Sequence, residues 1–568
     1  MTFQQDFTVV GDSLLWTTIV AMIPILYFFW ALAIKKMKGH IAGITTLIIA
    51  LILAIFVFHM PAQTAVMSAT QGAVYGILPI GWIIVTSVFL YKLTVKTGHF
   101  NIIRSSIVSI TEDRRLQALL IAFAFGSFLE GAAGFGAPVA ITAALLIGLG
   151  FNPMLAAGIC LLANTAPVAF GAIGIPITAM EGPTGIPAME ISQMTGRMLP
   201  WVAVFIPLYL VIIIAGFKRA LEVLPALIVT GVAFALTQFL SSNLLGPELP
   251  DILSALVTIV ALTIFLKFWK PKTIFRFANE QPGMVAGSAA TASEGKKEED
   301  QKYTGKEIFV AWSPFLVLTA FISLWGIPTI KQALLGQYDG TNILLQGVNY
   351  LGKALTFYPE VPFLHNQILD GASGEPIAAH FNLEILGSAG TAILLATIVT
   401  KYILKISWRD WFHVLRDTIK EIKFPLLTIL AVVGYAYVTN SSGMSTTLGF
   451  ALAQTGQLFP FFAPMLGWIG VFITGSDTSA NLLFAKLQQV TATSIGMEPV
   501  LALAANTAGG VTGKMISPQS IAVAAAAVGL AGREGNLFRF TVKHSLFLLF
   551  VICTMTFLIH HFFTFLIP

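Results

Sequence analysis

Apolar stretches of about 20 residues recur along this 568-residue chain, and short polar segments separate them. An α-helix rises 1.5 Å per residue, so about 20 apolar residues cross a hydrocarbon layer roughly 30 Å thick. The alternating strands of a membrane barrel would give a different pattern. We therefore predict an all-α polytopic membrane protein with about twelve spans, at residues 14–34, 41–60, 71–92, 154–180, 200–217, 224–243, 252–268, 308–328, 384–402, 424–440, 500–530 and 544–566.

Two further apolar segments are interrupted near their middles by small and polar residues. The first, 116–150, contains "FGSFLEGAAGFGAPVAI", and the second, 462–494, contains "TGSDTSANLLF". Backbone that leaves the helical conformation at membrane depth is tolerated only where protein or a water-filled cavity surrounds it. We interpret each segment as a re-entrant hairpin that returns to the side from which it entered.

The composition supports a membrane protein, since 56% of the residues are hydrophobic and only 10% are charged. Such a chain has too little polar surface for a soluble globule. Its two cysteines, Cys160 and Cys553, lie in apolar segments, which predicts buried side chains and no disulfide. The sequence has no zinc-ligand spacing and no nucleophile–base arrangement, and "GVTGK" lacks the spacing of a phosphate-binding loop. We expect no enzymatic activity, no cofactor and no metal.

Lysine and arginine are concentrated in alternate loops, which predicts the orientation of the chain. By the positive-inside rule these loops face the cytoplasm, so both termini lie outside if both hairpins return to the side they entered. The net charge of +5 then reflects orientation, and we expect no nucleic-acid partner. Five of the 32 basic residues lie elsewhere: Arg197, Lys331 and Lys353 in the opposite loops, and Lys486 and Lys514 at membrane depth.

A repeated motif divides the chain into two halves. "ANTAPVAFGAIGIP" begins at Ala163 and "ANTAGGVTGKMISP" begins at Ala505, and their shared tetrapeptide, glycine and proline coincide at a constant offset. In our trace the two copies cross the membrane in opposite directions, so the repeats are inverted. Inverted repeats with discontinuous helices are typical of secondary transporters, which bind substrate near the bilayer midplane.

The repeats give the following organisation. The first, 1–217, holds scaffold spans within 14–92, a hairpin at 116–150 and a broken helix at 154–180. Two linking spans and a polar cytoplasmic linker occupy 218–306. The second repeat, 307–568, holds scaffold spans within 308–440, a hairpin at 462–494 and a broken helix at 500–530. Residues 93–217 and 445–543 would form most of a transport domain, and the external stretch 329–383 would carry short helices at "IKQALL" and "LLQGVNYLGKAL".

Polar residues near the hairpin tips and helix breaks form the candidate site. Helix N-termini present free N–H donors and about half a positive charge, so several that converge at the midplane suit a small anion. Ionisable side chains inside a membrane are expensive unless they are paired or used. We predict substrate contacts from Lys514, Ser127, Asn164, Thr165, Ser476, Thr478, Asn506, Thr507 and Ser517, and proton coupling by Asp477, Glu130 and His544.

Each assignment has a structural alternative. Glu130 and Lys514 could form an ion pair that holds the two halves together. Asn164 and Asn506 could cap the helix breaks. His544 lies at the cytoplasmic start of the last span, where histidines are often inert, and Lys486 is expected to extend to the membrane interface. The sequence leaves open whether Asp477 or Glu130 carries the proton.

The quoted hairpin and helix-break motifs closely resemble the bacterial L-lactate permease family. The longest of them are "GSFLEGAAGFGAPVAI", "FITGSDTSANLLF" and "NTAGGVTGKMISPQSIAVA". The resemblance extends from the first span to the last. It implies proton-coupled uptake of lactate, with glycolate and related 2-hydroxymonocarboxylates as alternatives, across the bacterial cytoplasmic membrane. It also implies kinship with ion transporters that move a hairpin-bearing domain against a fixed scaffold in an elevator-like manner, often as dimers.

Two other functions stay open at this stage. A sodium-coupled carboxylate transporter would use Asp477 and the carbonyl groups of the helix breaks to bind Na⁺. An anion channel would conduct without coupling. The sequence does not distinguish lactate from glycolate or one lactate enantiomer from the other.

Overall fold

The computed structural model describes residues 2–132, 134, 137–277 and 303–568, and this part of the chain is mostly helical. The helices of the first half are α1 (Leu14–Phe29), α2 (Gly39–Phe56), α3 (Ala62–Tyr75), α4 (Trp82–Lys96), α5 (His99–Val108), α6 (Arg114–Ala118), α7 (Gly126–Ala132), α8 (Ala137–Gly148), α9 (Pro153–Ala163), α10 (Gly171–Thr184), α11 (Ala188–Ala203), α12 (Ile206–Ala215), α13 (Phe217–Leu221), α14 (Leu224–Leu244) and α15 (Pro250–Phe268). Three π-helical stretches continue neighbouring helices, namely η1 (Trp30–Ile34), η2 (Gly76–Gly81) and η3 (Leu119–Phe125), and η4 (Val168–Phe170) is a 3₁₀ turn.

The second half has a similar content of helices. They are α16 (Gly305–Gly326), α17 (Pro328–Leu334), α18 (Ile343–Leu355), α19 (Ala389–Ile403), α20 (Trp408–Ser441), α21 (Met444–Ala453), α22 (Phe459–Thr474), α23 (Asp477–Ile495), α24 (Pro499–Lys514), α25 (Pro518–Ala527) and α26 (Glu534–Phe562), with 3₁₀ turns η5 (Gly456–Leu458) and η6 (Thr564–Leu566). Four two-residue strands complete the described elements: β1 (Phe3–Gln4), β2 (Thr356–Phe357), β3 (Ile368–Leu369) and β4 (Leu383–Glu384).

The predicted class of polytopic membrane protein is confirmed. In the described residues, 11 helices are long and apolar enough to cross a membrane, or 12 if one bent pair counts as a single span. Several spans are longer than predicted: the one expected at 71–92 begins at Ala62, the one at 200–217 begins at Ala188, and the one at 424–440 belongs to Trp408–Ser441. These extensions carry polar residues, which the apolar windows of the sequence excluded.

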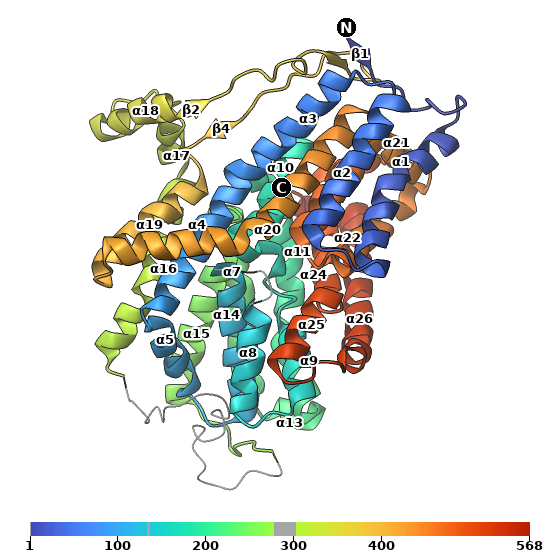
Figure 1. Ribbon diagram of the computed structural model, residues 1–568. Helices are drawn as coiled ribbons and strands as arrows, with labels where there is room; N and C mark the ends of the chain where they lie inside the picture. The colour runs from blue at the N-terminus through green and yellow to red at the C-terminus, as the bar shows by residue number, and fades with distance from the viewer. Residues whose placement is uncertain (1, 133, 135–136, 278–302) are drawn as a thin grey trace.

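Small residues allow the N-terminal helices to pack closely on α20. In Figure 1, α2 and α3 run beside α20, and these helices are in contact. A Cβ atom on Gly72 would lie only 2.6 Å from the carbonyl oxygen of Val433. Glycine at this position therefore sets how near α3 approaches α20.

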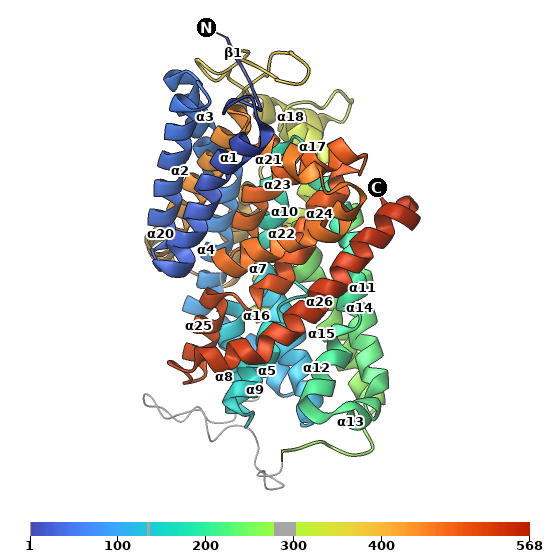
Figure 2. The ribbon, with the colours of Figure 1, turned by 90° about the vertical axis from the view of Figure 1, so that its right-hand side faces the viewer.

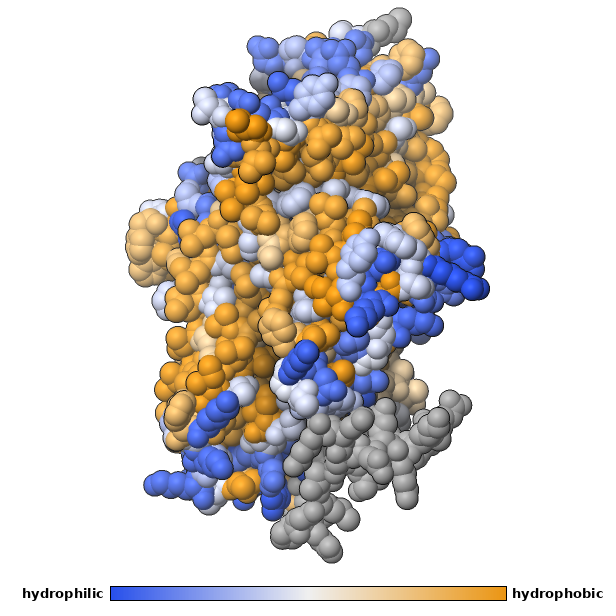
Figure 3. Space-filling model, turned by 90° about the vertical axis from the view of Figure 1, so that its left-hand side faces the viewer, coloured by the Kyte–Doolittle hydropathy of each residue, from blue (hydrophilic) through white to orange (hydrophobic). Residues whose placement is uncertain are grey.

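Apolar residues cover most of the face shown in Figure 3, and hydrophilic residues gather mainly toward its two ends. Large apolar side chains on the outer helices α1, α2, α14 and α26 are exposed. An extended apolar exterior of this kind fits contact with lipid rather than water.

The expected short helices are present within 329–383 as α17 and α18. The residues that follow them form an irregular segment, which Figure 1 shows at the top of the molecule beside the N-terminus. Strand β3 in this segment pairs in parallel with β1, and β2 pairs antiparallel with β4. In Figure 2 both chain ends lie toward this end, whereas α13 lies at the opposite one.

A buried arginine anchors the start of the helix that leads into the first interrupted segment. The Arg115 side chain is fully buried and forms ion pairs with Asp113 (2.7 Å) and Glu222 (2.8 Å). It also donates to the carbonyl oxygens of Arg219 and Thr273. A buried arginine is stable only when such partners satisfy its charge and its donors. These contacts fix the start of α6, and therefore the position of η3 and α7, relative to α13.

Candidate functional site

The second interrupted segment forms a sharp helix–turn–helix. Helix α22 ends at Thr474, Gly475 adopts a left-handed conformation with φ of 71°, and α23 begins at Asp477. The Ser476 hydroxyl caps α23 by accepting a hydrogen bond from the Ser479 N–H at 3.2 Å. "TGSDTSAN" therefore places the N-terminus of a 19-residue helix, with Asp477 in its first turn, at the tip of the turn.

The first interrupted segment is also divided into two helices. Helix α7 ends at Ala132 and α8 begins at Ala137, and residues 133, 135 and 136 between them lie outside the described part of the chain. Ser127 and Glu130 are buried on α7. A Cβ atom on Gly171, at the start of α10, would lie 3.0 Å from Oε1 of Glu130. The Glu130 carboxylate thus packs against the backbone of α10.

The two predicted helix breaks differ in position. In the first, α9 and the helical stretch 168–184 are bent by 62°, and Ala172, Ile173 and Gly174 all have positive φ. In the second, α24 passes without interruption through Gly509 and Gly510 and ends at Lys514. The broken helix predicted at 500–530 is therefore interrupted after Lys514 and not at this glycine pair.

Close packing explains why Gly509 and Gly510 stay helical. A Cβ atom on Gly509 would collide with the carbonyl group of Pro464 on α22, and one on Gly510 would collide with the Asp477 carboxylate. The glycines therefore let α24 approach α22 and the start of α23. The break comes instead at Met515 to Ser517, immediately before Pro518 begins α25.

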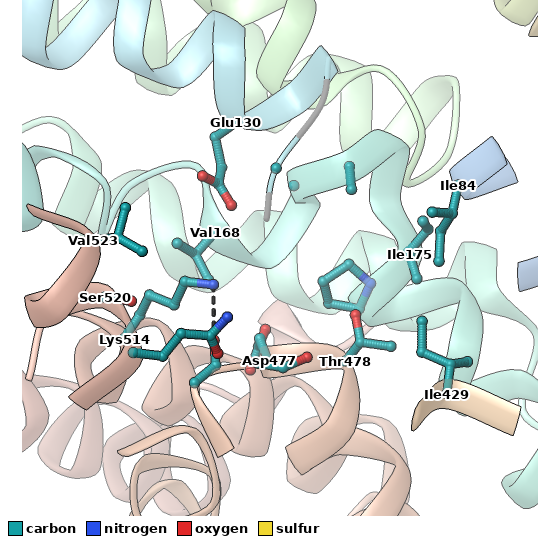
Figure 4. Close-up of a pocket in the computed structure, with 17 residues that line it drawn as sticks. Ile84, Glu130, Val168, Ile175, Ile429, Asp477, Thr478, Lys514, Ser520 and Val523 are labelled. Atoms are coloured by element: carbon teal, nitrogen blue, oxygen red, sulfur yellow. Dashed lines mark hydrogen bonds between the residues drawn. The ribbon is translucent and has the colours of Figure 1, made fainter. Parts of the chain in front are cut away.

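A cavity of about 80 Å³ lies where these elements meet. Figure 4 shows Glu130 on one side, Asp477 and Thr478 on the other, and Lys514 extending between them. The starts of α10, α23 and α25 all contribute to its wall. The lining residues are Ile84, Glu130, Gly134, Val168, Gly171, Ala172, Ile175, Pro176, Ile429, Gly475, Ser476, Asp477, Thr478, Lys514, Gln519, Ser520 and Val523.

Lys514 is the basic residue of this cavity. Its ammonium group donates a hydrogen bond to the carbonyl oxygen of Gly475 at 3.0 Å, drawn as a dashed line in Figure 4. It interacts electrostatically with both Glu130 and Asp477. Among the described ion pairs within 4 Å, none includes Lys514, so the direct Glu130–Lys514 ion pair considered from the sequence is not formed.

Several buried polar groups around the cavity have no hydrogen-bond partner within the described protein. In the cavity wall they are both carboxylate oxygens of Asp477 and Oε2 of Glu130. The predicted substrate contacts Ser127, Asn164 and Thr165 also have unpaired side-chain atoms (Oγ, Nδ2 and Oγ1), but these three residues lie outside the cavity wall. Buried polar groups are normally paired, because each unpaired one costs about 1–3 kcal/mol. A concentration of such groups around one charged cavity favours a binding site for a polar ligand or proton.

Other predicted residues lie outside the cavity wall and have protein partners. Asn506 donates to Oδ1 of Asn481 at 2.8 Å and accepts from Nε2 of Gln488 at 3.0 Å. Thr507 donates to the carbonyl oxygen of Leu503, and Ser517 caps α25 by accepting from the N–H of Ser520. These three side chains therefore stabilise the helices around the cavity and do not line it.

His544 also lies outside the cavity wall. Its Nδ1 atom is 2.6 Å from the hydroxyl oxygen of Tyr209, and its ring packs beside that of Phe540. Its location thus offers no direct contact with Glu130, Asp477 or Lys514.

The sequence reasoning missed Asp251. This residue is 1% exposed in the first turn of α15, and neither of its carboxylate oxygens has a partner in the described protein. It interacts electrostatically with Glu130, and a Cβ atom on Gly131 would lie 2.7 Å from the Cβ atom of Asp251. In the sequence, the signal for this residue is a single acidic side chain at the start of an apolar span. That span is one of the two predicted linking spans, outside the predicted site.

The cavity wall also contains residues that polarity alone would not identify. Ile84 on α4 and Ile429 on α20 close one side of it, as Figure 4 shows. Gln519 and Ser520 come from the first turn of α25, directly after the predicted Ser517.

The chain matches the family model described as L-lactate permease over residues 17–563. It is 67% identical to an L-lactate permease of Bacillus subtilis over 568 residues, covering all of both chains. It is 50% identical to the glycolate permease GlcA of Escherichia coli, covering 96% of each chain, and 47% identical to an L-lactate permease of that species over the full length of both. A solved structure of Neisseria gonorrhoeae MtrF gives a TM-score of 0.46 at 14% identity, over 86% of this chain and 82% of that one, too distant to guide interpretation. Together, the family match and these relatives establish that the chain belongs to the L-lactate permease family.

Proposed function

We propose that this protein is a secondary transporter that imports lactate together with protons across the bacterial cytoplasmic membrane, with glycolate as a second substrate. The observation that carries the proposal is the buried cavity in which Lys514 extends between Glu130 and Asp477. The relatives named as lactate and glycolate permeases support the same class of substrate, a small 2-hydroxycarboxylate.

The cavity chemistry suits such an anion. The substrate carboxylate would pair with the Lys514 ammonium group, which donates to the Gly475 carbonyl and to no other group among the described residues. The starts of α23 and α25 would add free N–H donors and partial positive charge. The substrate hydroxyl would bond to Thr478, Ser520 or Gln519, whose polar groups line the same space.

Charge balance explains why a proton would accompany the substrate. In the empty site, one ionised carboxylate balances Lys514. When lactate becomes the partner of the lysine, the displaced carboxylate would be an unpaired charge in a buried site, which is strongly unfavourable. Uptake of one proton by that carboxylate restores neutrality. One proton per lactate therefore leaves the charge of the site unchanged.

Asp477 is our choice for the group that takes up this proton. Both of its oxygens lack partners, and Lys514 donates to Gly475, only two residues before Asp477. Glu130 and Asp251 would form a second pair of buried carboxyls that passes protons along the other side of the cavity.

We further propose that the two halves are inverted repeats and that residues 93–217 and 445–543 move as a transport domain. The cavity is built from related elements of both halves, around α7 and α10 on one side and α23 to α25 on the other. Ile84 and Ile429 come from the proposed scaffold and present apolar side chains to this polar site. An apolar wall across which the domain slides would suit elevator-like movement, with both hairpins re-entrant and both termini outside.

Uptake by proteoliposomes tests the proposal. Purified protein should accumulate labelled lactate when the exterior is acidic and no sodium is present, and an uncoupler should abolish accumulation. Unlabelled glycolate should compete. Absolute dependence on sodium would favour a sodium-coupled carrier, and lactate conductance that no ion gradient can drive uphill would indicate a channel. Either result would refute proton symport.

A further inference from the structure

A second group of titratable side chains lies far from the cavity, in the irregular segment between α18 and α19. Glu360 and His380 are joined by an antiparallel β-bridge, which places their side chains next to each other. The ring of His365 lies 4.5 Å from that of His380 between centroids, and its Nε2 atom is 3.6 Å from Oε1 of Glu360. One ligand atom from each of these three residues lies within 4.8 Å of the other two.

The surrounding backbone holds the group in place. The N–H of Val361 donates to the carbonyl oxygen of Ala379, and that of Phe381 donates to the carbonyl oxygen of Pro359. Gln71 on α3 donates to the carbonyl oxygen of His380 at 3.0 Å, which ties this segment to the helical body. Backbone hydrogen bonds within the segment, together with the bond from Gln71, therefore hold Glu360, His365 and His380 in position.

Backbone atoms of Ala379 hold the Nδ1 side of the His365 ring. Nδ1 lies 3.1 Å from the carbonyl oxygen of Ala379, and the N–H of Ala379 lies 3.2 Å from the same ring atom. Nε2 is the ring nitrogen that faces Glu360, and it binds a metal ion when Nδ1 carries the proton and donates to the carbonyl oxygen. Metal-binding histidines commonly donate their other ring N–H to a backbone carbonyl or carboxylate, because this fixes both the tautomer and the orientation of the ring.

We propose that Glu360, His365 and His380 bind a divalent transition-metal ion of the Zn²⁺ class. Two histidines and one carboxylate are a usual ligand set for Zn²⁺, with ligand distances of about 2.0–2.2 Å and a fourth position for water. Glu360 is exposed, so its side chain can rotate to bring the ligand atoms closer. The ligand order, with 4 residues between Glu360 and His365 and 14 between His365 and His380, matches no zinc motif, so the sequence gave no signal of it.

A metal ion bound to these three residues would stabilise the segment that covers a second cavity. His380 lines a cavity of about 560 Å³ between this segment and the helical body, together with Tyr75 on α3, Tyr437 on α20 and Lys486 on α23. A metal ion would link residues 360, 365 and 380, and so hold together the part of the segment that covers this cavity.

Titration of the full-length protein with Zn²⁺ tests the proposal. The protein is purified in detergent through a tag without histidine, treated with chelator and titrated by calorimetry. We expect one tight equivalent of Zn²⁺ per chain, weakened by at least about tenfold in His365→Ala and in His380→Ala, since loss of even an outer partner of a metal site costs that much. Co²⁺ in place of Zn²⁺ should give the intense visible absorption of a low-coordinate nitrogen and oxygen site.

His413→Ala is the matched control. His413 is exposed and lies 3.2 Å from a carboxylate, that of Asp417, but it belongs to no group of three ligands among the described residues. This variant should bind Zn²⁺ as the parent does. Size-exclusion profiles establish that each variant is folded. Absence of the tight equivalent in the parent, its retention in both cluster variants, or equal weakening in His413→Ala would each overturn the proposal.

Discussion

The two copies of the repeated motif have several residues in common but differ in backbone conformation. In 163–176 the chain leaves the helix at Asn164 and turns through left-handed residues before α10 continues. In 505–518 the corresponding Asn506 lies inside α24, which stays helical up to Lys514. A shared sequence therefore marks related positions in the two halves without fixing the local conformation.

The two copies also differ in how the protein satisfies their buried polar side chains. In the first copy, Nδ2 of Asn164 and the hydroxyl of Thr165 are buried and form no hydrogen bond within the described part of the chain, although Asn164 interacts with the Glu130 carboxylate. In the second, Asn506 is held by Asn481 and Gln488. We infer that Lys514 is the side chain of the second copy that contacts the ligand, and that Asn506 belongs to the frame that positions it.

Removal of Lys514 should have the largest effect on this division of roles. Lys514→Ala is expected to reduce lactate uptake by about 100-fold or more, because truncation of one partner of a buried charge pair costs about 2–5 kcal/mol. Initial rates in proteoliposomes over a range of lactate concentrations measure the loss.

Lys486→Ala is the control for this experiment, because Lys486 bonds to Gln489 and lines the larger cavity instead. It should leave uptake within a few-fold of the parent. Unchanged apparent affinity in Lys514→Ala would disprove its role as the substrate cation, and the second copy would then contribute no direct contact.

The two carboxylates that flank Lys514 should differ in their contribution to coupling. Asp477→Asn is expected to abolish accumulation driven by a pH gradient while exchange of internal for external lactate persists, because exchange needs no net proton movement. Glu130→Gln should accumulate lactate more slowly but still uphill. Counterflow and gradient-driven assays on the same liposomes distinguish these outcomes, and the reverse pattern would assign the proton to Glu130.

The sequence predicted those features whose energetic cost depends on residue type and order alone. Apolar length predicted most of the spans, but those expected at 384–402 and 500–530 are not among the candidate membrane-crossing helices of the described residues. The energetic cost of charge in a membrane identified Glu130, Asp477 and Lys514, which all line one cavity. The contacts across the cavity could not be predicted, because Ile84 and Ile429 reach it through tertiary packing. The position of the break within 500–530 could not be predicted either, because glycines such as Gly509 and Gly510 serve close helix packing as readily as a helix break.

The paired asparagines should separate binding from stability. Asn506→Ala is expected to lower the free energy of unfolding by about 1–3 kcal/mol, because it leaves buried groups of Asn481 and Gln488 unpaired. Asn164→Ala removes a group without such partners, so the melting temperature should stay near that of the parent while uptake falls by about 3–10-fold, the value of one hydrogen bond. Thermal melts in detergent and uptake rates measure both effects, and equal melting temperatures for the two variants would contradict the distinction.

The smallest effect is expected at the helix that follows the second copy. Ser517 caps α25, whereas Phe170, the residue before α10, supplies no capping side chain. Ser517→Ala should therefore lower the free energy of unfolding by about 1 kcal/mol, the usual cost of losing a helix cap, without changing the apparent affinity for lactate. Ser407→Ala, which removes the cap of α20 far from the cavity, is the matched control and should cause a similar loss. If Ser517→Ala instead weakened lactate binding and left the melting temperature unchanged, Ser517 would be a substrate contact in addition to Lys514.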